Sequence, residues 1–419
     1  MKPLHLPVIA AFALHQFAFA QAPAVFEEAI WLNASDLLSP DLLRGPSHRV
    51  REQAFTDGYM AHFEIDTDFG SFKAIGVPQV KRRIVEAEAI RTLVETSKGD
   101  LFAEGLKRSI EQPIDAVKNI ISHPVDSVKG VPKTVGHFFS KVGASVERGV
   151  TKVRENSEAE KQASAGEVGR SVGNTAKDMA GFDSAKLNTA RQLGVDPYSD
   201  NVRLQEEMDK VTWAFFAGGL PLRVGAAVVS AGAALTVTNM VGVPEETYSL
   251  TQSELALRDQ RSLATMGLRE ADILTFQIQP SLSTTRRHRI VKALEALPNA
   301  AGRGRVILLA NSCATPEQAD FLVAALSTLE ERQRSGAADY RDLHVFGRLP
   351  AGVTATGVLE VPAPVDHVTW TEQVAGFASR DDLGTAPKAL IHTGQLSPAA
   401  TAGFSASGWN VTPVAYPKY

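Results

Sequence analysis

Residues 305–326 read RVILLANSCATPEQADFLVAAL, and this stretch decides the fold class that we predict from the sequence. Its apolar start is short and ends at a polar turn, which is typical of a strand buried in a sheet. Thr315, the proline at position 316 and Gln318 then mark the start of a helix. A buried strand that leads into a helix is the repeating unit of a layered α/β fold with parallel strands.

The same alternation of short apolar runs and helical periods continues along the C-terminal third of the chain. Strands are expected at residues 272–278, 305–310, 343–349, 356–361, 388–394 and 408–414, and helices at 286–297, 316–333, 370–379 and 398–404. Strands that alternate with helices favour parallel pairing, because the helix returns the chain to the same end of the sheet. We therefore predict a layered, mostly parallel α/β domain over residues 268–419.

The first hundred residues carry a different pattern. Apolar and polar residues alternate over 59–76, with a turn at Thr67–Gly70, and this predicts a hairpin. Over 77–97 the apolar spacing changes to three and four residues, which is typical of an amphipathic helix. A further helix is expected at 25–31. We predict a small α+β unit over 21–100 and, for the whole chain, an α+β fold class with a helical N-terminal half.

A near-repeat of seven residues follows, PIDAVKN at 113–119 and PVDSVKG at 124–130. Each copy opens with proline and has an aspartate two residues later, as expected at the start of a short helix. The apolar residues keep helical spacing and share one face: Ile114, Val117, Ile121, Val125, Val128, Val135 and Phe138. We predict a proline-hinged amphipathic helical array over 101–154 that contacts an anionic lipid surface or a partner protein. The alternative is that these helices pack on the core of the chain itself.

Two further segments separate this array from the α/β domain. Residues 155–195 are polar and poor in large apolar groups, which predicts a flexible linker. Residues 196–267 are expected to be helical and include 224–243, an apolar run without charged residues. This run just reaches the length of a bilayer span, but alanine, glycine and polar residues dilute its hydrophobicity. A helix buried in protein and a helix buried in lipid are both compatible with the pattern.

The N-terminus has the features of a secretory signal peptide over residues 1–20. Lys2 precedes an apolar run from Val8 to Ala20, and Ala18-Phe19-Ala20 resembles a cleavage site. The chain has a single cysteine and therefore no intramolecular disulfide. We predict an exported bacterial protein, periplasmic or secreted, which associates with a membrane if the amphipathic array binds lipid.

The charge balance argues against one class of partner. Lysine and arginine together number 43, against 47 aspartate and glutamate residues. Nucleic-acid binding requires a basic surface that displaces counterions, and this composition does not supply one. No nucleic-acid partner is predicted.

One candidate catalytic site is found in the α/β domain. Cys313 follows the expected strand 305–310, so it would lie at the carboxyl end of a strand, where ligands bind. A thiol near a helix N-terminus is also more acidic than usual. With His392 and Asp366 it could form an acyl-transfer site, and the alternative is a small buried residue in a turn. No metal or cofactor is predicted, because the chain lacks metal-ligand spacings and a phosphate-binding glycine motif after a strand.

These patterns favour a non-enzymatic protein that binds or scaffolds at a membrane surface, or with a partner protein, through its amphipathic helices. Two alternatives come from other functional classes. One is an α/β hydrolase or a small-molecule-binding enzyme that uses Cys313. The other is a secreted effector whose apolar helix inserts into a membrane.

Overall fold

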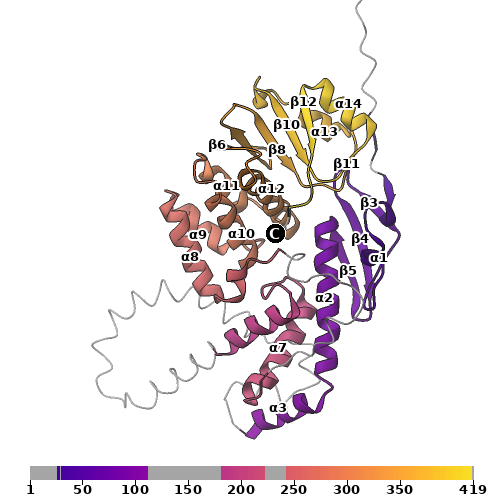
Figure 1. The fold of residues 1–419 in the computed structure, drawn as a ribbon, viewed down its shortest axis with the longest axis vertical. Coiled ribbons are helices and arrows are strands. Elements are labelled where there is room, and N and C mark those ends of the chain that lie inside the picture. The colour runs from indigo at the N-terminus through magenta and orange to yellow at the C-terminus, as the bar shows by residue number, and fades with distance from the viewer. Residues whose placement is uncertain (1–25, 29, 112–180, 222–241, 418–419) are drawn as a thin grey trace, which may run out of the picture.

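The computed structural model describes residues 26–28, 30–111, 181–221 and 242–417, which form a mixed α/β structure with several sheets (Figure 1). The predicted signal peptide lies outside the described residues. So do the repeat that begins at residue 113 and residues 224–241 of the apolar run. In the described part of the chain, no helix has both the length and the hydrophobicity of a membrane span.

An antiparallel sheet of five strands occupies the N-terminal part. Its strands are β1 (Trp31–Asn33), β2 (Arg49–Val50), β3 (Gln53–Thr56), β4 (Ala61–Thr67) and β5 (Gly70–Ile75). β4 pairs with β5 on one side and with β3 and β2 on the other. Phe63 and Ile65 alternate with polar residues of β4 and are buried. Helix α2 (Val77–Thr96) packs on β4 and β5, so the hairpin and the helix expected over 59–97 are β4, β5 and α2.

The start of the described chain differs from the prediction of a helical N-terminal half. A helix was expected over 25–31, but Trp31 begins strand β1. Trp31 pairs with Phe55 of β3, and the two rings lie edge to face at 5.5 Å. Strand pairing therefore outweighs the weak helical pattern of this short segment, since cross-strand aromatic pairs stabilise a sheet.

Helices from three separate segments pack beside this sheet. They are α3 (Asp100–Glu111), residues 181–193 and α7 (Val202–Ala217). α7 contacts α2 and α3, and Asn201 caps α7 by accepting a hydrogen bond from Leu204 N at 3.2 Å. Residues 181–193 belong to the predicted linker 155–195, yet Ala190 and Leu193 lie in one buried cluster with residues of α2 and α7. This end of the segment is therefore part of the core.

Five helices form the next part of the chain. They are α8 (Gln252–Thr265), α9 (Glu270–Ile278), α10 (Thr284–Glu295), α11 (Arg303–Asn311) and α12 (Pro316–Arg334). The strand predictions for 272–278 and 305–310 are wrong, because these segments are α9 and α11. A short apolar run does not distinguish a buried strand from a buried helix. In α11 the buried residues Val306, Ile307, Leu309 and Ala310 share one face, whereas Leu308 is 48% exposed, and this spacing is that of a helix with one buried face.

A mixed sheet of five strands forms the C-terminal part. Its strands are β6 (Tyr340–Phe346), β7 (Leu349–Thr354), β8 (Leu359–Ala363), β10 (Lys388–His392) and β12 (Trp409–Pro413), in the order β12-β10-β8-β7-β6. β8, β10 and β12 are parallel, whereas β6, β7 and β8 are antiparallel. The prediction of a mostly parallel sheet therefore needs correction. The prediction of one strand over 343–349 is wrong, because this segment contains the two-residue turn Gly347–Arg348 between β6 and β7.

Helices cover both faces of this sheet. Glu360 of β8 points to α12, where Arg332 donates two hydrogen bonds to its carboxylate at 2.6 and 2.8 Å. The next residue, Val361, faces the opposite way and is buried in one cluster with Phe404 of α14 (Pro398–Ala406). Helix α13 (Glu372–Ala378) packs against α14. Burial from both sides explains why all five residues of β8 are buried.

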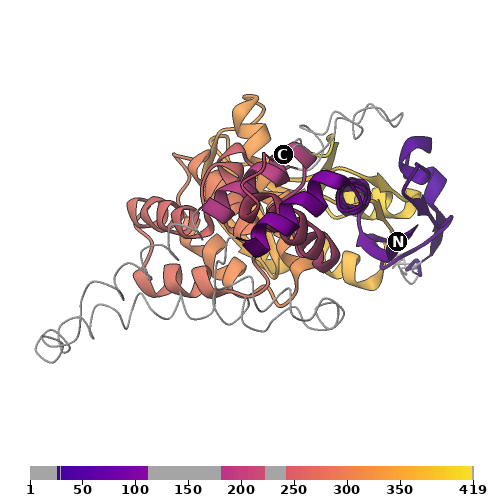
Figure 2. The same ribbon diagram turned by 90° about the horizontal axis from the view of Figure 1, so that it is seen from below.

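The N-terminal sheet is attached to the C-terminal part through the loop between β3 and β4. Asp366 N donates a hydrogen bond to Tyr59 O at 3.0 Å, and Thr369 N donates to Gly58 O at 2.9 Å. The Asp366 carboxylate accepts hydrogen bonds from Ala61 N at 2.9 Å and Val77 N at 3.0 Å. We call these contacts the junction. They hold the N-terminal sheet beside the C-terminal strands, as both ribbon views show (Figures 1 and 2).

Candidate functional site

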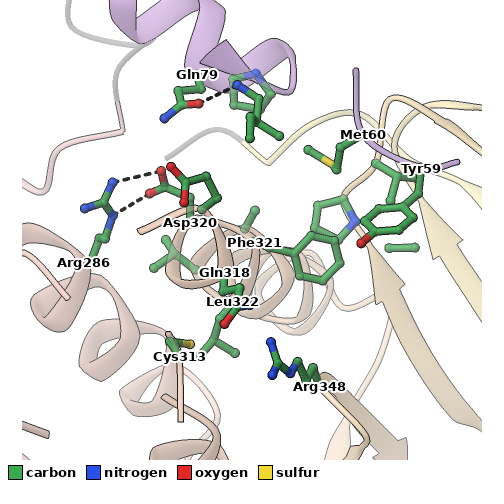
Figure 3. Close-up of a pocket in the computed structure, with 18 of the residues that line it drawn as sticks. Tyr59, Met60, Gln79, Arg286, Cys313, Gln318, Asp320, Phe321, Leu322 and Arg348 are labelled. Atoms are coloured by element: carbon green, nitrogen blue, oxygen red, sulfur yellow. Dashed lines mark hydrogen bonds and ion pairs between the residues drawn. The ribbon is translucent and has the colours of Figure 1, made fainter. Parts of the chain in front are cut away.

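A cavity of about 480 Å³ lies between the N-terminal sheet, α2 and the C-terminal part (Figure 3). Tyr59 and Met60 reach it from the β3–β4 loop, and Phe321 reaches it from α12. Pro364 and Val365 line it immediately after β8. Because β8 runs parallel to β10, the cavity lies at the carboxyl end of parallel strands, where open α/β sheets bind ligands.

Much of the cavity wall is apolar. The side chains that share this property come from several elements: Met60, Phe321, Leu349, Val374, Phe377 and Phe404. Phe404 is 2% exposed and lies edge-on to Trp370 and Trp409 at 5.4 and 5.9 Å. This packing fixes the position of the aromatic wall, so the cavity is formed by ordered side chains.

Charged side chains at one side of the cavity form an ion-pair network. The members that line the cavity are Arg82, Asp200, Arg286 and Asp320, and Arg83 and Glu86 extend the network behind them. Arg286 donates to Asp320 at 2.7 Å and to Asp200 at 2.8 Å (Figure 3 shows the contact with Asp320). Arg82 donates to Asp320 at 3.2 Å. The network therefore ties α2 to α10 and α12, and to the turn that precedes α7.

Arg286 and Asp320, the two central members of the network, are both charged at neutral pH. Burial favours the neutral forms of both groups and by itself would lower the pKa of Arg286 and raise that of Asp320. The opposite charges of the partners, with their hydrogen bonds, outweigh burial. The pKa of Arg286 is raised and the pKa of Asp320 is lowered. Because these groups bind each other, we interpret the network as a structural element of the site.

Cys313 lines the cavity, but its surroundings differ from those predicted. It follows α11 and precedes α12, so it does not lie at the end of a strand. Its Sγ donates a hydrogen bond to Leu309 O at 3.6 Å. Burial raises the pKa of the Cys313 thiol, and the nearby charge of Arg348 opposes this rise only in part. The expectation of an acidic thiol is therefore wrong, and the protonated form dominates at neutral pH.

The two residues predicted to act with Cys313 make other contacts. His392 lies at the end of β10, with its Nδ1 2.8 Å from Gly394 O, and burial lowers its pKa. Asp366 belongs to the junction and also accepts a hydrogen bond from the Tyr416 hydroxyl. Neither residue lines the cavity. The acyl-transfer site stays a prediction, since no described hydrogen bond joins its three members.

The predicted absence of a metal site can be compared with the described residues only. Within residues 26–28, 30–111, 181–221 and 242–417, no three histidine, cysteine, aspartate or glutamate side chains are placed to hold a metal ion. The residues that line the cavity supply an apolar wall, hydrogen-bonding groups and charged side chains.

Arg348 is a cavity residue that the sequence interpretation overlooked. It occupies the second position of the Gly347–Arg348 turn, and Gly347 has a φ of +62°. A glycine at the first position of a two-residue loop is a known hairpin signal, so the pattern Phe-Gly-Arg-Leu could have revealed the turn.

Comparisons of the chain with protein-family models, with curated proteins and with solved structures found no match.

Proposed function

We propose that this chain is a binding protein that holds a small molecule with a largely apolar body in the cavity between the N-terminal sheet, α2 and the C-terminal part. The observation that carries the proposal is the cavity itself. Its volume of about 480 Å³ falls within the range of about 300–1,000 Å³ that is usual for small-molecule sites. Phe321 and Phe377 contribute ring surface to its wall, and burial of a ligand against such surface supplies the main favourable free energy.

Binding is favoured over catalysis by the state of the polar groups. A nucleophile requires a base within hydrogen-bond reach, or a lowered pKa. The Cys313 thiol instead donates to a backbone carbonyl and has a raised pKa. The ionised side chains Arg286 and Asp320 neutralise each other. This arrangement supports a protein that holds its ligand without changing it.

A neutral fluorescent probe tests the proposal. N-phenyl-1-naphthylamine is apolar and uncharged, and we expect it to bind the chain in the micromolar range with a rise in fluorescence. Val374→Trp in α13 would fill part of the cavity, so most of this rise should be lost. Glu372→Trp is the matched control, because Glu372 lies on the same helix, is exposed and does not line the cavity. Equal probe binding by both variants, with unchanged melting temperatures, would contradict the proposal.

The reactivity of Cys313 separates this proposal from the enzyme alternative. Because burial raises the pKa of its thiol, we expect a thiol reagent to label the folded chain slowly at pH 7. The rate should rise with pH and should increase strongly on unfolding in urea. Rapid labelling of the folded chain at pH 7 would support an activated nucleophile instead. Labelling that slows when the neutral probe is bound would place the probe beside Cys313.

The surface predicted from the proline-containing repeat is a second proposal. We expect residues such as Val117, Val128 and Phe138 to contact an anionic membrane or a partner protein, and what supports this is the helical spacing of the sequence alone. The same holds for export, which rests on the pattern of residues 1–20. Flotation of the mature chain with anionic vesicles tests the membrane form of this proposal.

A further inference from the structure

Several polar groups of the cavity have hydrogen-bonding capacity that the protein does not use. In the part of the chain that the structure describes, the guanidinium of Arg348 has no hydrogen bond and no ion pair, although it lines the cavity. Gln318 accepts a hydrogen bond from Ala314 N at 2.9 Å through Oε1, which leaves its NH₂ group as a donor. These two groups can therefore serve a ligand.

The free groups belong to different elements but face the same space. Figure 3 shows the guanidinium of Arg348 directed toward the side of the cavity on which Gln318, Leu322 and Cys313 lie. Tyr59 lies across the cavity from them. Arg348 is exposed at the surface, and it lines the same cavity as Tyr59 and Cys313. A ligand atom near Arg348 would thus meet hydrogen-bond donors.

The other cationic groups of the wall are occupied. Arg82 and Arg286 are bound by Asp320, and Arg289 donates to the Ser327 hydroxyl at 2.6 Å. Among the acidic residues, Asp57 contacts His62 at 3.2 Å, and Glu317 lines the cavity without a described ion pair. Asp196 also lines the cavity and accepts hydrogen bonds from Thr285 Oγ1 at 2.6 Å and Tyr198 N at 2.9 Å. Arg348 and Glu317 are charged cavity residues without a described ion pair or side-chain hydrogen bond, and they would favour ligands of opposite sign.

We infer that the ligand is a carboxylic acid with an apolar chain or ring system, and that its carboxylate binds Arg348. This inference rests on the proposed function and adds the ligand class to it. One guanidinium balances one negative charge and can bind both oxygens of a carboxylate. The Gln318 NH₂ group is a further donor for the same head group, whereas the positive charge of Arg348 would repel an ammonium group at this position. The apolar body would extend along Phe321, Val374 and Phe377.

Displacement of bound N-phenyl-1-naphthylamine by decanoate and by decanol tests the inference. The two competitors share an apolar chain and differ in the charged head group. We expect decanoate to displace the probe at about tenfold lower concentration than decanol, because a hydrogen bond to a charged group adds roughly that factor. Arg348→Gln should remove this advantage and leave decanol unchanged. Glu317→Gln is the matched control, and its affinity for decanoate should equal or exceed that of the wild type.

The outcomes separate the inference from the proposed function. Equal displacement by decanoate and decanol would overturn the carboxylate assignment while the binding function stands. Weaker displacement of the probe by both decanoate and decanol in Arg348→Gln would also overturn the carboxylate assignment. Arg348 would then support the shape of the cavity and not bind the head group. Failure of the probe itself to bind would overturn the proposed function. Loss of decanoate binding in Glu317→Gln but not in Arg348→Gln would exclude Arg348 as the partner.

Discussion

Replacement of Asp320 by asparagine is expected to lower the free energy of unfolding by about 3 kcal/mol. Asp320 accepts hydrogen bonds from Arg286 at 2.7 and 3.0 Å and from Arg82 at 3.2 Å. Removal of its charge leaves two arginines in a poorly solvated space without their shared counter-ion, and breaking a buried pair costs about 3–5 kcal/mol. We place the effect at the lower end because the side chain of Asp320 is 20% exposed. Urea unfolding followed by circular dichroism measures it.

Asp339→Asn is the matched control for this change, because Asp339 pairs with Arg341 and both side chains are about half exposed to solvent. Asp339→Asn should change the free energy of unfolding only slightly. The lowered pKa of Asp320 adds a pH dependence. The carboxylate of Asp320 stabilises the fold above the pKa of an unfolded aspartate, about 3.9. This contribution is lost as the pH falls through the lower folded value, so the difference between wild type and Asp320→Asn should shrink in acid. An equal loss for Asp320→Asn and Asp339→Asn would contradict the assigned role of the network.

Replacement of Asp366 by alanine is expected to destabilise the chain by a similar amount, again about 3 kcal/mol. Asp366 is 2% exposed, and its carboxylate accepts from two backbone N–H groups, those of Ala61 and Val77. Alanine would leave both donors buried without an acceptor, and each such group costs about 1–3 kcal/mol. Since Ala61 and Val77 belong to the N-terminal part, the junction should loosen. Probe binding should weaken with it, because Tyr59 and Met60 line the cavity from the same loop.

Asp366→Asn provides the comparison, since asparagine has the same shape and keeps one oxygen acceptor. Its loss of stability should be smaller than that of Asp366→Ala. Burial raises the pKa of Asp366, so the folded state binds a proton more readily than the unfolded state does. The contribution of Asp366 to stability is therefore largest below the pKa of an unfolded aspartate and falls as the pH rises through the folded value. An unchanged melting temperature in Asp366→Ala would show that the junction does not depend on this carboxylate.

Helix starts and hairpins with strong local signals could be predicted from the sequence. Thr315 accepts a hydrogen bond from Gln318 N at the start of α12, as the pattern Thr-Pro-Glu-Gln indicated. Ser397 caps α14 in the same way. In these cases the side chain and the backbone group that it satisfies lie within four residues of each other. The alternation of apolar and polar residues over β4 and β5 is an equally local signal for the hairpin.

Segments without such signals were misassigned. α9 and α11 are short apolar runs, and their neighbours in the fold decide whether they become helices or strands. In α9 the buried residues Ile273 and Phe276 are three positions apart, but Leu274 and Ile278 are exposed apolar residues that obscure the period. The turn at Gly347–Arg348 was hidden because the apolar residues on both sides were read as one continuous strand.

The candidate site depends on contacts between distant parts of the chain, and these could not be predicted. Arg82 and Asp320 are separated by 238 positions, and Asp366 and Ala61 by 305. No periodicity relates such residues. The prediction for Cys313 depended on its place beside a predicted strand, and Cys313 does line the cavity, although no strand precedes it. It lies between two helices, where burial suppresses the ionisation on which the catalytic interpretation depended.

A ligand in the cavity would contact both parts of the chain at once. Met60 belongs to the N-terminal sheet region and Phe377 to the C-terminal part, and both line the cavity. Binding to the folded state alone raises stability with ligand concentration, by about 2.7 kcal/mol at a hundredfold excess over the dissociation constant. The cavity therefore couples ligand binding to the association of the two parts.

The most direct test of the account is a crystal structure of the chain with 10-bromodecanoate, whose bromine can be located by its anomalous signal. We predict one molecule in the cavity, with the bromine near Phe377 or Phe404 and the carboxylate on Arg348. A cavity occupied by the chain's own side chains, with the fatty acid bound elsewhere or absent, would contradict the claim that this space holds a small molecule.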